Sequence, residues 1–405
     1  MSFSCSDRYL AYRSTSRSGA WLSGGTPQRN EPTYWGGDVP WIGSKDLKPF
    51  DLDDSSEFVT EDGARAGSRV VDAGAVLFVT RGMSLAKEFR VGVATRRLAF
   101  NQDVKAIVPR DDLDCRFLAW FLRASERYVL DQCDTATHGT KRLPLERIES
   151  LPVPLPPLAE QRRIAAILDE AGALREMRRK SIALLDALVG STFLEMFGDP
   201  VTNPRAWPTT ALGDVSESFQ YGTSTKCCES EAADSLPVLR IPNVVGGRVN
   251  WSDLKYAALS DTEVQSLRLA PGDLLFVRTN GNPDYIARCA VVPDGGRDSL
   301  FASYLIRLRF RIDAGLLPSY VQAVVSAPSY RSVIEREART TAGNYNISAE
   351  GLRSLVIPRP PLRDQRAYEA FIAATSRERA TLAGALLESE RLFASLLSET
   401  FRTIR

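Results

Sequence analysis

The chain carries one segment twice, and this duplication limits what it can fold into. Residues 154–161 read Pro-Leu-Pro-Pro-Leu-Ala-Glu-Gln, and residues 358–365 read Pro-Arg-Pro-Pro-Leu-Arg-Asp-Gln. Farther upstream, Gly-Ala-Val-Leu-Phe-Val at 74–79 matches Gly-Asp-Leu-Leu-Phe-Val at 272–277. The two pairs are separated by slightly different distances, so loops differ in length between otherwise similar halves. A period of this size predicts a duplicated pair of domains and not a solenoid of short repeats.

Each half has the same internal order. Short β-type runs separated by Gly, Pro, Asn and Asp come first. A proline-rich stretch then interrupts regular structure, and a long run with apolar residues three and four positions apart follows. This pattern predicts helices over about 159–197 and 364–401, each roughly 50 Å long at 1.5 Å per residue. Either helix alone fits an ordinary amphipathic core helix, but two of them in a duplicated chain predict antiparallel pairing about a pseudo-twofold axis.

Composition limits the class of protein. The 51 Lys and Arg residues nearly balance the 50 Asp and Glu residues, so the net charge of +1 gives no indication of a nucleic-acid partner. The chain lacks a run of about 18 apolar residues, so we expect no membrane-spanning helix. Six cysteines without a Cys-x-x-Cys pair predict reduced thiols in the cytoplasm. A single histidine argues against His-rich zinc sites and most two-histidine mechanisms.

The order of these features resembles a known family. A β-rich region, the Pro-Pro-Leu-Ala-Glu-Gln segment, a long helix ending in Phe-Leu-Glu-Met-Phe-Gly and a repeat of the whole set are similar to the specificity subunits of type I restriction–modification enzymes. Residues 221–226, 238–243 and 273–282 are similar to parts of the target recognition domains of that family, as are 23–27 and 100–103 in the first half. The likeness covers almost the whole chain.

The resemblance implies an α+β fold with two β-rich target recognition domains separated by two long antiparallel, coiled-coil-like helices. The domains would cover 1–152 and 200–358, and the helical spacer regions 153–199 and 359–405. The family reads two halves of a split double-stranded DNA sequence and docks methyltransferase subunits, with restriction subunits as further partners where a nuclease exists. S-adenosylmethionine, and ATP with Mg²⁺ for a nuclease, would be bound by those partners, so the chain itself is expected to hold no cofactor or metal and to carry out no catalysis.

The first half departs from the family pattern near its beginning. The second half opens with Trp-Pro at 207–208 and Leu-Gly-Asp-Val at 212–215, which is similar to the first strand of such a domain. Residues 10–21 are instead rich in Ser and Arg and show no regular pattern. This difference predicts either that the first recognition domain lacks its opening strand or that the start of the sequence is wrongly assigned.

Candidate DNA contacts are polar residues that follow the β-type runs, where loops display side chains. Arg and Lys bind phosphate or pair with guanine, whereas Asn and Gln match adenine. In the first half the candidates are Ser44, Lys45, Arg81, Gln102, His138, Thr140 and Lys141. In the second half they are Tyr221, Thr223, Ser224, Lys226, Arg240, Asn243, Arg278, Thr279, Asn280, Asn282, Arg288, Asn344, Tyr345 and Asn346. Any one of them taken alone also fits a solvated loop residue.

Two other classes of protein stay open. Asn282-Pro283-Asp284-Tyr285 partly matches the Asn/Asp-Pro-Pro-Tyr/Phe motif of amino-methyltransferases, with Asp in place of the second proline. No glycine-rich strand–loop–helix pattern for S-adenosylmethionine accompanies it, and no Gly-x-x-x-x-Gly-Lys-Ser/Thr loop for nucleotides occurs. The second class is a scaffold whose β-rich domains bind proteins. Salt-dependent DNA binding would distinguish the favoured interpretation from this one.

Overall fold

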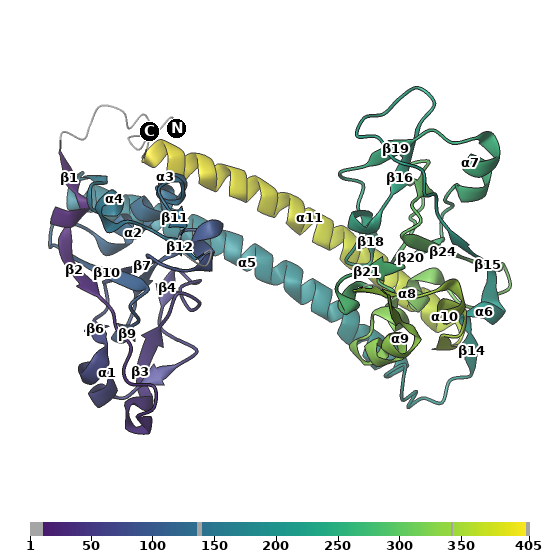
Figure 1. Ribbon diagram of the computed structural model, residues 1–405, viewed down its shortest axis with the longest axis horizontal. Coiled ribbons are helices and arrows are strands. Elements are labelled where there is room, and N and C mark those ends of the chain that lie inside the picture. The colour runs from purple at the N-terminus through teal and green to yellow at the C-terminus, as the bar shows by residue number, and fades with distance from the viewer. Residues whose placement is uncertain (1–10, 136–139, 342, 402–405) are drawn as a thin grey trace. The chain divides into compact units, whose positions relative to one another are not determined.

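The computed structural model describes residues 11–135, 140–341 and 343–401, and of Thr341 only the backbone. The chain divides into two compact units, Met1–Arg179 with Ala383–Arg405, and Lys180–Leu382 (Figure 1). Helices α5 (Leu158–Phe197) and α11 (Leu362–Thr400) contribute residues to both units. The two long helices are therefore confirmed within three residues of their predicted ends. The finer division into four segments ending at 152, 199, 358 and 405 stays a prediction.

The first unit holds two sheets with separate hydrophobic interiors. One sheet has the strand order β2 (Gly19–Ser23), β10 (Val104–Pro109), β7 (Val76–Val79), β8 (Val91–Ala94) and β4 (Asp51–Leu52). The other has the order β5 (Phe58–Val59), β3 (Trp35–Ile42), β9 (Leu98–Phe100) and β6 (Arg69–Val71). Strand β7 is buried at every residue because it lies between β10 and β8 and is contacted by a helix. A continuous apolar run is what such a central strand requires.

The second unit repeats this arrangement with a six-stranded main sheet and a three-stranded second sheet. The main sheet has the order β15 (Ser216–Tyr221), β24 (Leu305–Phe310), β20 (Leu274–Val277), β22 (Cys289–Val291), β18 (Arg248–Val249) and β17 (Val244–Val245). A second sheet has the order β19 (Lys255–Ala257), β16 (Leu236–Leu239) and β23 (Leu300–Phe301). Strand β20 corresponds to β7, because both pair antiparallel with the two strands beside them and are buried throughout.

A pair of short strands corrects the prediction about the beginning of the first half. Strand β14 (Thr209–Ala211) pairs with β27 (Val356–Pro358), just before α11. In the same way β1 (Tyr12–Ser14) pairs with β13 (Pro152–Pro154), just before α5. The prediction that the first domain lacks its opening strand is therefore wrong. The strand is only three residues long, and its partner lies about 140 residues away in sequence, so no local hydrophobic pattern reveals it.

Short helices cover the main sheets, and their ends follow ordinary capping rules. Helix α2 (Cys115–Ala124) contacts β7 and β8, and α8 (Pro318–Ser326) contacts β22. The Asp114 carboxylate accepts hydrogen bonds from the backbone N–H groups of Arg116 and Phe117, which fixes the start of α2. The other short helices are α1 (Glu61–Gly67), α3 (Glu126–Asp131), α4 (Leu145–Glu149), α6 (Leu212–Val215), α7 (Asp261–Leu267), α9 (Arg331–Glu337) and α10 (Ala349–Arg353).

In the first unit, Trp120 of α2 joins the ends of both long helices to the β-rich part. Its indole N–H donates to Asp169 of α5 at 2.8 Å, and its ring packs edge-on against Phe393 of α11 with centroids 5.5 Å apart. The other face of the indole stacks on Phe50 at 4.1 Å. Near the end of α11, Phe401 packs against rings of α2. Large buried aromatic contacts of this kind contribute substantially to stability.

In the second unit, an aromatic cluster joins both long helices to the β-rich part. Phe193 and Phe197 of α5 pack against Tyr320 of α8 and Tyr368 of α11, with ring centroids 4.9–5.9 Å apart. Burial raises the pKa of the Tyr368 hydroxyl to about 12, and this hydroxyl donates to the backbone oxygen of Val189 at 3.3 Å. The end of α5 that carries Phe-Leu-Glu-Met-Phe-Gly is therefore a docking segment for the second unit.

The two long helices run antiparallel within each unit. In the first unit, Arg175 of α5 lies over the ring of Phe393, whereas Arg178 donates to the backbone oxygen of Ala385 at 2.9 Å. Rising residue numbers in α5 thus meet falling numbers in α11. In the second unit, Asp186 of α5 pairs with Arg379 at 2.8 Å, and Val189 meets Tyr368. The predicted antiparallel pairing is confirmed. Within the described residues, no helix is long and apolar enough to cross a membrane.

The duplicated proline-rich segment is built around a buried glutamine. The Gln161 side-chain N–H₂ donates to the backbone oxygens of Asp112 and Pro156, and its Oε1 accepts from the Asp114 N–H. Gln365 repeats this arrangement with the oxygens of Gly315 and Pro360 and the N–H of Leu317. Each glutamine thereby ties the start of a long helix to the loop before a sheet-covering helix. This structural role explains why the motif occurs in both halves.

Replacing Gln365 with leucine should lower the free energy of unfolding of the second unit by about 2–4 kcal/mol. The change leaves one buried and two part-buried backbone groups without their partner, and each buried group without a partner costs about 1–3 kcal/mol, less where water can reach it. Chemical denaturation monitored by fluorescence would measure this loss. Arg366→Leu alters an exposed neighbour in the same helical turn and should change stability by less than about 0.5 kcal/mol. Equal stability of the two variants would contradict the structural role of the glutamine.

Candidate nucleic-acid interface

In the second unit, a small sheet gathers many of the predicted contact residues. It has the order β21 (Thr279–Asn280), β26 (Asn344–Asn346) and β25 (Arg339–Thr341), with Thr279 opposite Asn346 and Asn280 opposite Tyr345. Strand β21 follows the buried strand β20 after one residue, Arg278. Residues from two distant parts of the sequence are thus placed side by side.

Arg278 connects this sheet to the next candidate, Tyr221. Its guanidinium carbon lies 4.8 Å from the centre of the Tyr221 ring, and one of its N–H groups donates to the backbone oxygen of Ser303 at 3.4 Å. The Tyr221 hydroxyl accepts from the backbone N–H of Ala349 at 3.0 Å. These contacts hold the half-buried Arg278 side chain in place.

The loop after β21 is shaped by its own side chains. The Asn280 Oδ1 accepts from the N–H of Asn282 at 2.9 Å, and the Asn282 Oδ1 accepts from the N–H of Asp284 at 3.0 Å. Arg288 donates to the backbone oxygen of Asp284, and its guanidinium carbon lies 3.7 Å above the ring centre of Tyr285. The partial methyltransferase motif at 282–285 therefore begins with an asparagine that caps a 3-10 turn, which is an ordinary structural use of this residue.

The loop of Thr223, Ser224 and Lys226 lies beside the same cluster, because Thr223 and Ser303 are joined by a backbone hydrogen bond of 2.7 Å. Thr223 is buried, and its hydroxyl accepts from the N–H of Thr225. Ser224 and Lys226 are exposed. Just before this loop, a Cβ at Gly222 would lie 2.1 Å from the backbone oxygen of Phe301, so only glycine fits there.

Two candidates of the second unit must be corrected, the buried Thr223 described above and Asn243. Asn243 is fully buried, and its amide N–H₂ donates to the backbone oxygens of Asn250 and Ser252. Its Oδ1 accepts from the N–H of Arg240. The side chain is used up in organising its own loop, so it is no exposed contact residue. The neighbouring Arg240 is half-buried and paired with Asp253 at 3.1 Å.

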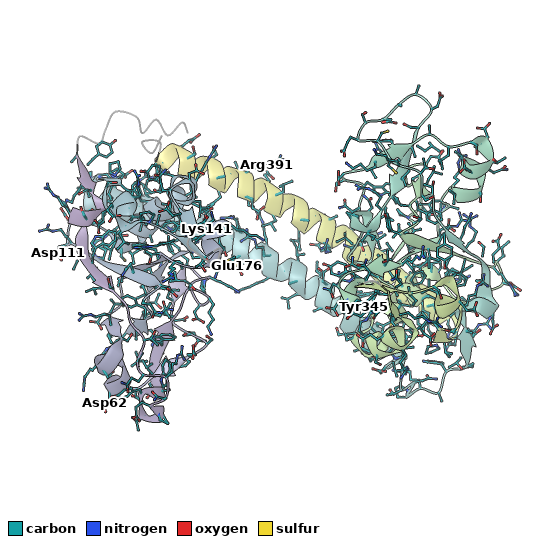
Figure 2. The ribbon with its side chains drawn as sticks, in the orientation of Figure 1. Asp62, Asp111, Lys141, Glu176, Tyr345 and Arg391 are labelled. Carbon is teal, nitrogen blue, oxygen red and sulfur yellow. The ribbon has the colours of Figure 1, made fainter. Side chains whose placement is uncertain are left out.

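The first unit contains a smaller version of the same cluster. Strands β11 (Asp134–Thr135) and β12 (Lys141–Arg142) form a hairpin, and Arg81 forms an isolated β-bridge with Arg142. The Lys141 ammonium donates to the Thr135 hydroxyl at 2.9 Å. Figure 2 labels Lys141 and, at the matching position of the second unit, Tyr345. Thr140 is half-buried beside this hairpin, whereas His138 lies outside the described residues.

The remaining candidates of the first unit follow two parallel strands. Strand β3 pairs with β9, with Ile42 opposite Phe100, so both strands end at the same edge. Ser44 and Lys45 follow one strand and Gln102 follows the other. Gln102 is exposed and accepts from the Thr26 hydroxyl at 2.6 Å, and Lys45 lies 3.7 Å from Glu57.

Arg81 lies near the carboxyl group of Asp103, so its surroundings are not purely positive. Its backbone N–H donates to the oxygen of Asp103. Burial raises the pKa of the Asp103 carboxyl, and the nearby Arg81 guanidinium opposes that increase. Arg81 itself is exposed. Arg81 therefore presents its positive charge beside a carboxyl group whose ionisation is disfavoured by burial.

Two exposed residues of these clusters were not among the sequence-based candidates. Arg142 lies in β12 directly beside Lys141, and Tyr304 precedes β24, where its backbone oxygen accepts from the N–H of Arg278. Both are exposed. The signal for Arg142 was its position next to a candidate at the end of the first half. Tyr304 had no such signal, because it becomes a neighbour of Arg278 only through the pairing of β20 with β24.

Comparison with known proteins finds relatives of this chain that share its sequence features. Residues 21–185 match the family model of the type I restriction modification DNA specificity domain. The specificity subunit of the Escherichia coli K12 enzyme EcoKI is 28% identical over 267 residues, which cover 62% of this chain and 57% of that protein. The MjaIX specificity subunit of Methanocaldococcus jannaschii is 25% identical over 246 residues, 55% of each protein. Over these regions the chain is similar to the specificity subunits of type I restriction enzymes.

The matches to these specificity subunits span about half the length of each curated relative. Solved structures extend the likeness in fold to the whole chain. The S subunit of the type I restriction-modification system from M. genitalium covers 98% of this chain and 97% of its own, at 12% identity and a TM-score of 0.56. A chain from a structure of type I complex assembly and conformational transition covers 98% and 100%, at 16% identity and a TM-score of 0.51. At these identities the structures support the fold alone.

Proposed function

We propose that this chain is the sequence-specific DNA-binding subunit of a type I restriction–modification complex, in which each unit reads one half of a bipartite site. The observation that carries the proposal is the repeated cluster at the strand ends. In one unit Arg81 lies beside β12, and in the other Thr279 and Asn280 lie beside β26. Two similar surfaces with different side chains suit the recognition of two different half-sites.

The side chains of the second cluster match the chemistry of base edges. The guanidinium of Arg278 suits the O6 and N7 acceptors of guanine, and the amides of Asn280 and Asn344 suit the N6 and N7 of adenine. Exposed Lys226 suits a phosphate, where charge fixes position without reading sequence. The phosphate contact would hold the DNA in register, and the Arg and Asn side chains would read its bases at the same time.

The long helices supply the remaining functions of the subunit. Both pass from one unit to the other, so their length would set the separation of the two half-sites. They also carry exposed apolar side chains, namely Leu174, Met177, Leu184, Leu188, Leu387 and Leu392. Apolar groups on polar helices are typical of surfaces that a partner covers. We assign this surface to methyltransferase subunits in the cytoplasm, with restriction subunits joining where a nuclease exists.

Purified alone, the chain should transfer no methyl group from S-adenosylmethionine to DNA, whereas the complex with its methyltransferase partner should do so. The reason is that S-adenosylmethionine, and ATP with Mg²⁺ for cleavage, are assigned to the partners. Incorporation of labelled methyl groups would measure this. Transfer by the isolated chain that disappears in Asn282→Ala would instead support the amino-methyltransferase interpretation.

DNA binding by the full chain with its methyltransferase partner should weaken linearly with the logarithm of salt concentration. Each neutralised phosphate contributes a slope of about −0.9. Fluorescence anisotropy with labelled duplex at several salt concentrations would measure it. Lys226→Ala should make the slope shallower by about one, whereas Arg363→Ala, an exposed change on α11, should leave it unchanged. Affinity for DNA that does not depend on salt would favour the scaffold interpretation.

A further inference from the structure

The two units carry an exposed apolar side chain at corresponding turns. The 3-10 turn η3 (Met83–Ala86) lies between β7 and β8, and η5 (Pro283–Tyr285) lies between β20 and β22. Met83 is 66% exposed and Tyr285 is 40% exposed. Each follows the strand-end cluster of its unit, so an apolar group stands among candidates that are otherwise polar.

The backbone around the exposed Met83 is restrained on both sides. Gly82 has a φ of +147°, which only glycine adopts readily, and its N–H donates to the backbone oxygen of Lys141 at 3.0 Å. The turn that follows closes with hydrogen bonds of 2.8 Å from Lys87 and Glu88 to the oxygen of Ser84. Met83 is therefore held on a fixed turn beside Arg81 and the β11–β12 hairpin.

The corresponding turn of the second unit is fixed as well. Asn282 caps it, and Arg331 of α9 donates to the backbone oxygen of Ile286 at 2.8 Å. The ring of Tyr285 is covered on one face by Arg288, 3.7 Å from its centre. Both units thus carry a large exposed apolar side chain on the restrained turn after their central strand, at the first residue of η3 and at the last residue of η5.

An exposed methionine with a fixed backbone suits an apolar ligand group at the DNA surface. In the major groove, the apolar group at base edges is the C5 position of pyrimidines, which carries the methyl group of thymine. We propose that Met83 contacts the C5 edge of one pyrimidine in the half-site read by the first unit, and that Tyr285 is its counterpart in the second. This inference rests on the proposed DNA-binding function and adds a specificity-determining residue to it.

The test changes methyl groups one at a time. In the half-site, each thymine is replaced in turn by deoxyuridine and each cytosine by 5-methylcytosine, so every base pair is probed through its pyrimidine. Affinity is measured by anisotropy for the full chain with its methyltransferase partner. At one base pair the methyl change should alter affinity about fourfold, as expected for one buried methyl group. In Met83→Ala the effect at that base pair should fall below about twofold.

Three further variants serve as controls. Met83→Leu keeps an apolar group and should retain most of the methyl effect. Val108→Ala, an exposed apolar change toward the other end of β10, and Tyr285→Ala in the second unit should leave it unchanged. Specific binding whose methyl effects are the same in wild type and Met83→Ala, or absent from both, would overturn the inference. Loss of specific DNA binding by the wild-type complex would instead overturn the proposed function.

Discussion

Replacing Arg278 and Asn280 together with alanine will relax recognition of one half-site and leave the preference at the other half unchanged. Both residues lie at the strand-end cluster of the second unit. A lost base contact typically costs about 1–3 kcal/mol, so affinity for the intact site should fall by at least about tenfold. Methylation mapping of the variant complex would show which positions of the motif become degenerate.

The reciprocal variant supplies the control. Arg81→Ala with Lys141→Ala alters the first cluster and should relax the other half-site only. Arg363→Ala changes an exposed arginine on α11 and should affect neither half. If the Arg278 and Asn280 variant alters both halves while its thermal melting stays like that of wild type, the assignment of one half-site to each unit is wrong.

Adding four residues to both long helices at the unit boundary will lengthen the gap between the half-sites by one or two base pairs. Insertions after Arg179 in α5 and after Leu382 in α11 leave the docking contacts of each unit intact, because Asp169, Phe393 and Tyr368 keep their neighbours. Four residues add close to one turn, roughly 6 Å, so the apolar stripe nearly keeps its face. DNA rises about 3.4 Å per base pair along a strand, which gives the predicted change.

The motif methylated by the insertion variant is the readout, and the half-site sequences should stay the same. A four-residue insertion after Gly295, in an exposed turn of the second unit, is the matched control and should leave the gap as it was. An active helix variant with an unchanged gap would show that the helices do not set the spacing.

The features that sequence reasoning predicted were those repeated in the chain or periodic over many residues. The two helices follow from apolar spacing over about forty residues, and the proline-rich segment was visible because it occurs twice. Its function was not visible. Only the folded chain shows that Gln161 and Gln365 each bond to backbone groups about fifty residues away.

The features that sequence reasoning missed depend on contacts between distant residues. Tyr12–Ser14 forms a strand because 152–154 supplies its partner, and three residues are too few for a pattern. Asn243 follows a β-type run, as an exposed loop residue would, but its loop folds back and uses the amide internally. Choosing contact residues from strand ends therefore finds the right loops and cannot separate surface groups from groups that shape the loop.

The most direct measurement is a genome-wide methylation map of cells that express the methyltransferase partner with and without this chain. We predict methylation at a single bipartite motif, with two short specific halves separated by a fixed unspecific gap, only when the chain is present. The same methylation without the chain, or a motif that is continuous and has no gap, would contradict the account.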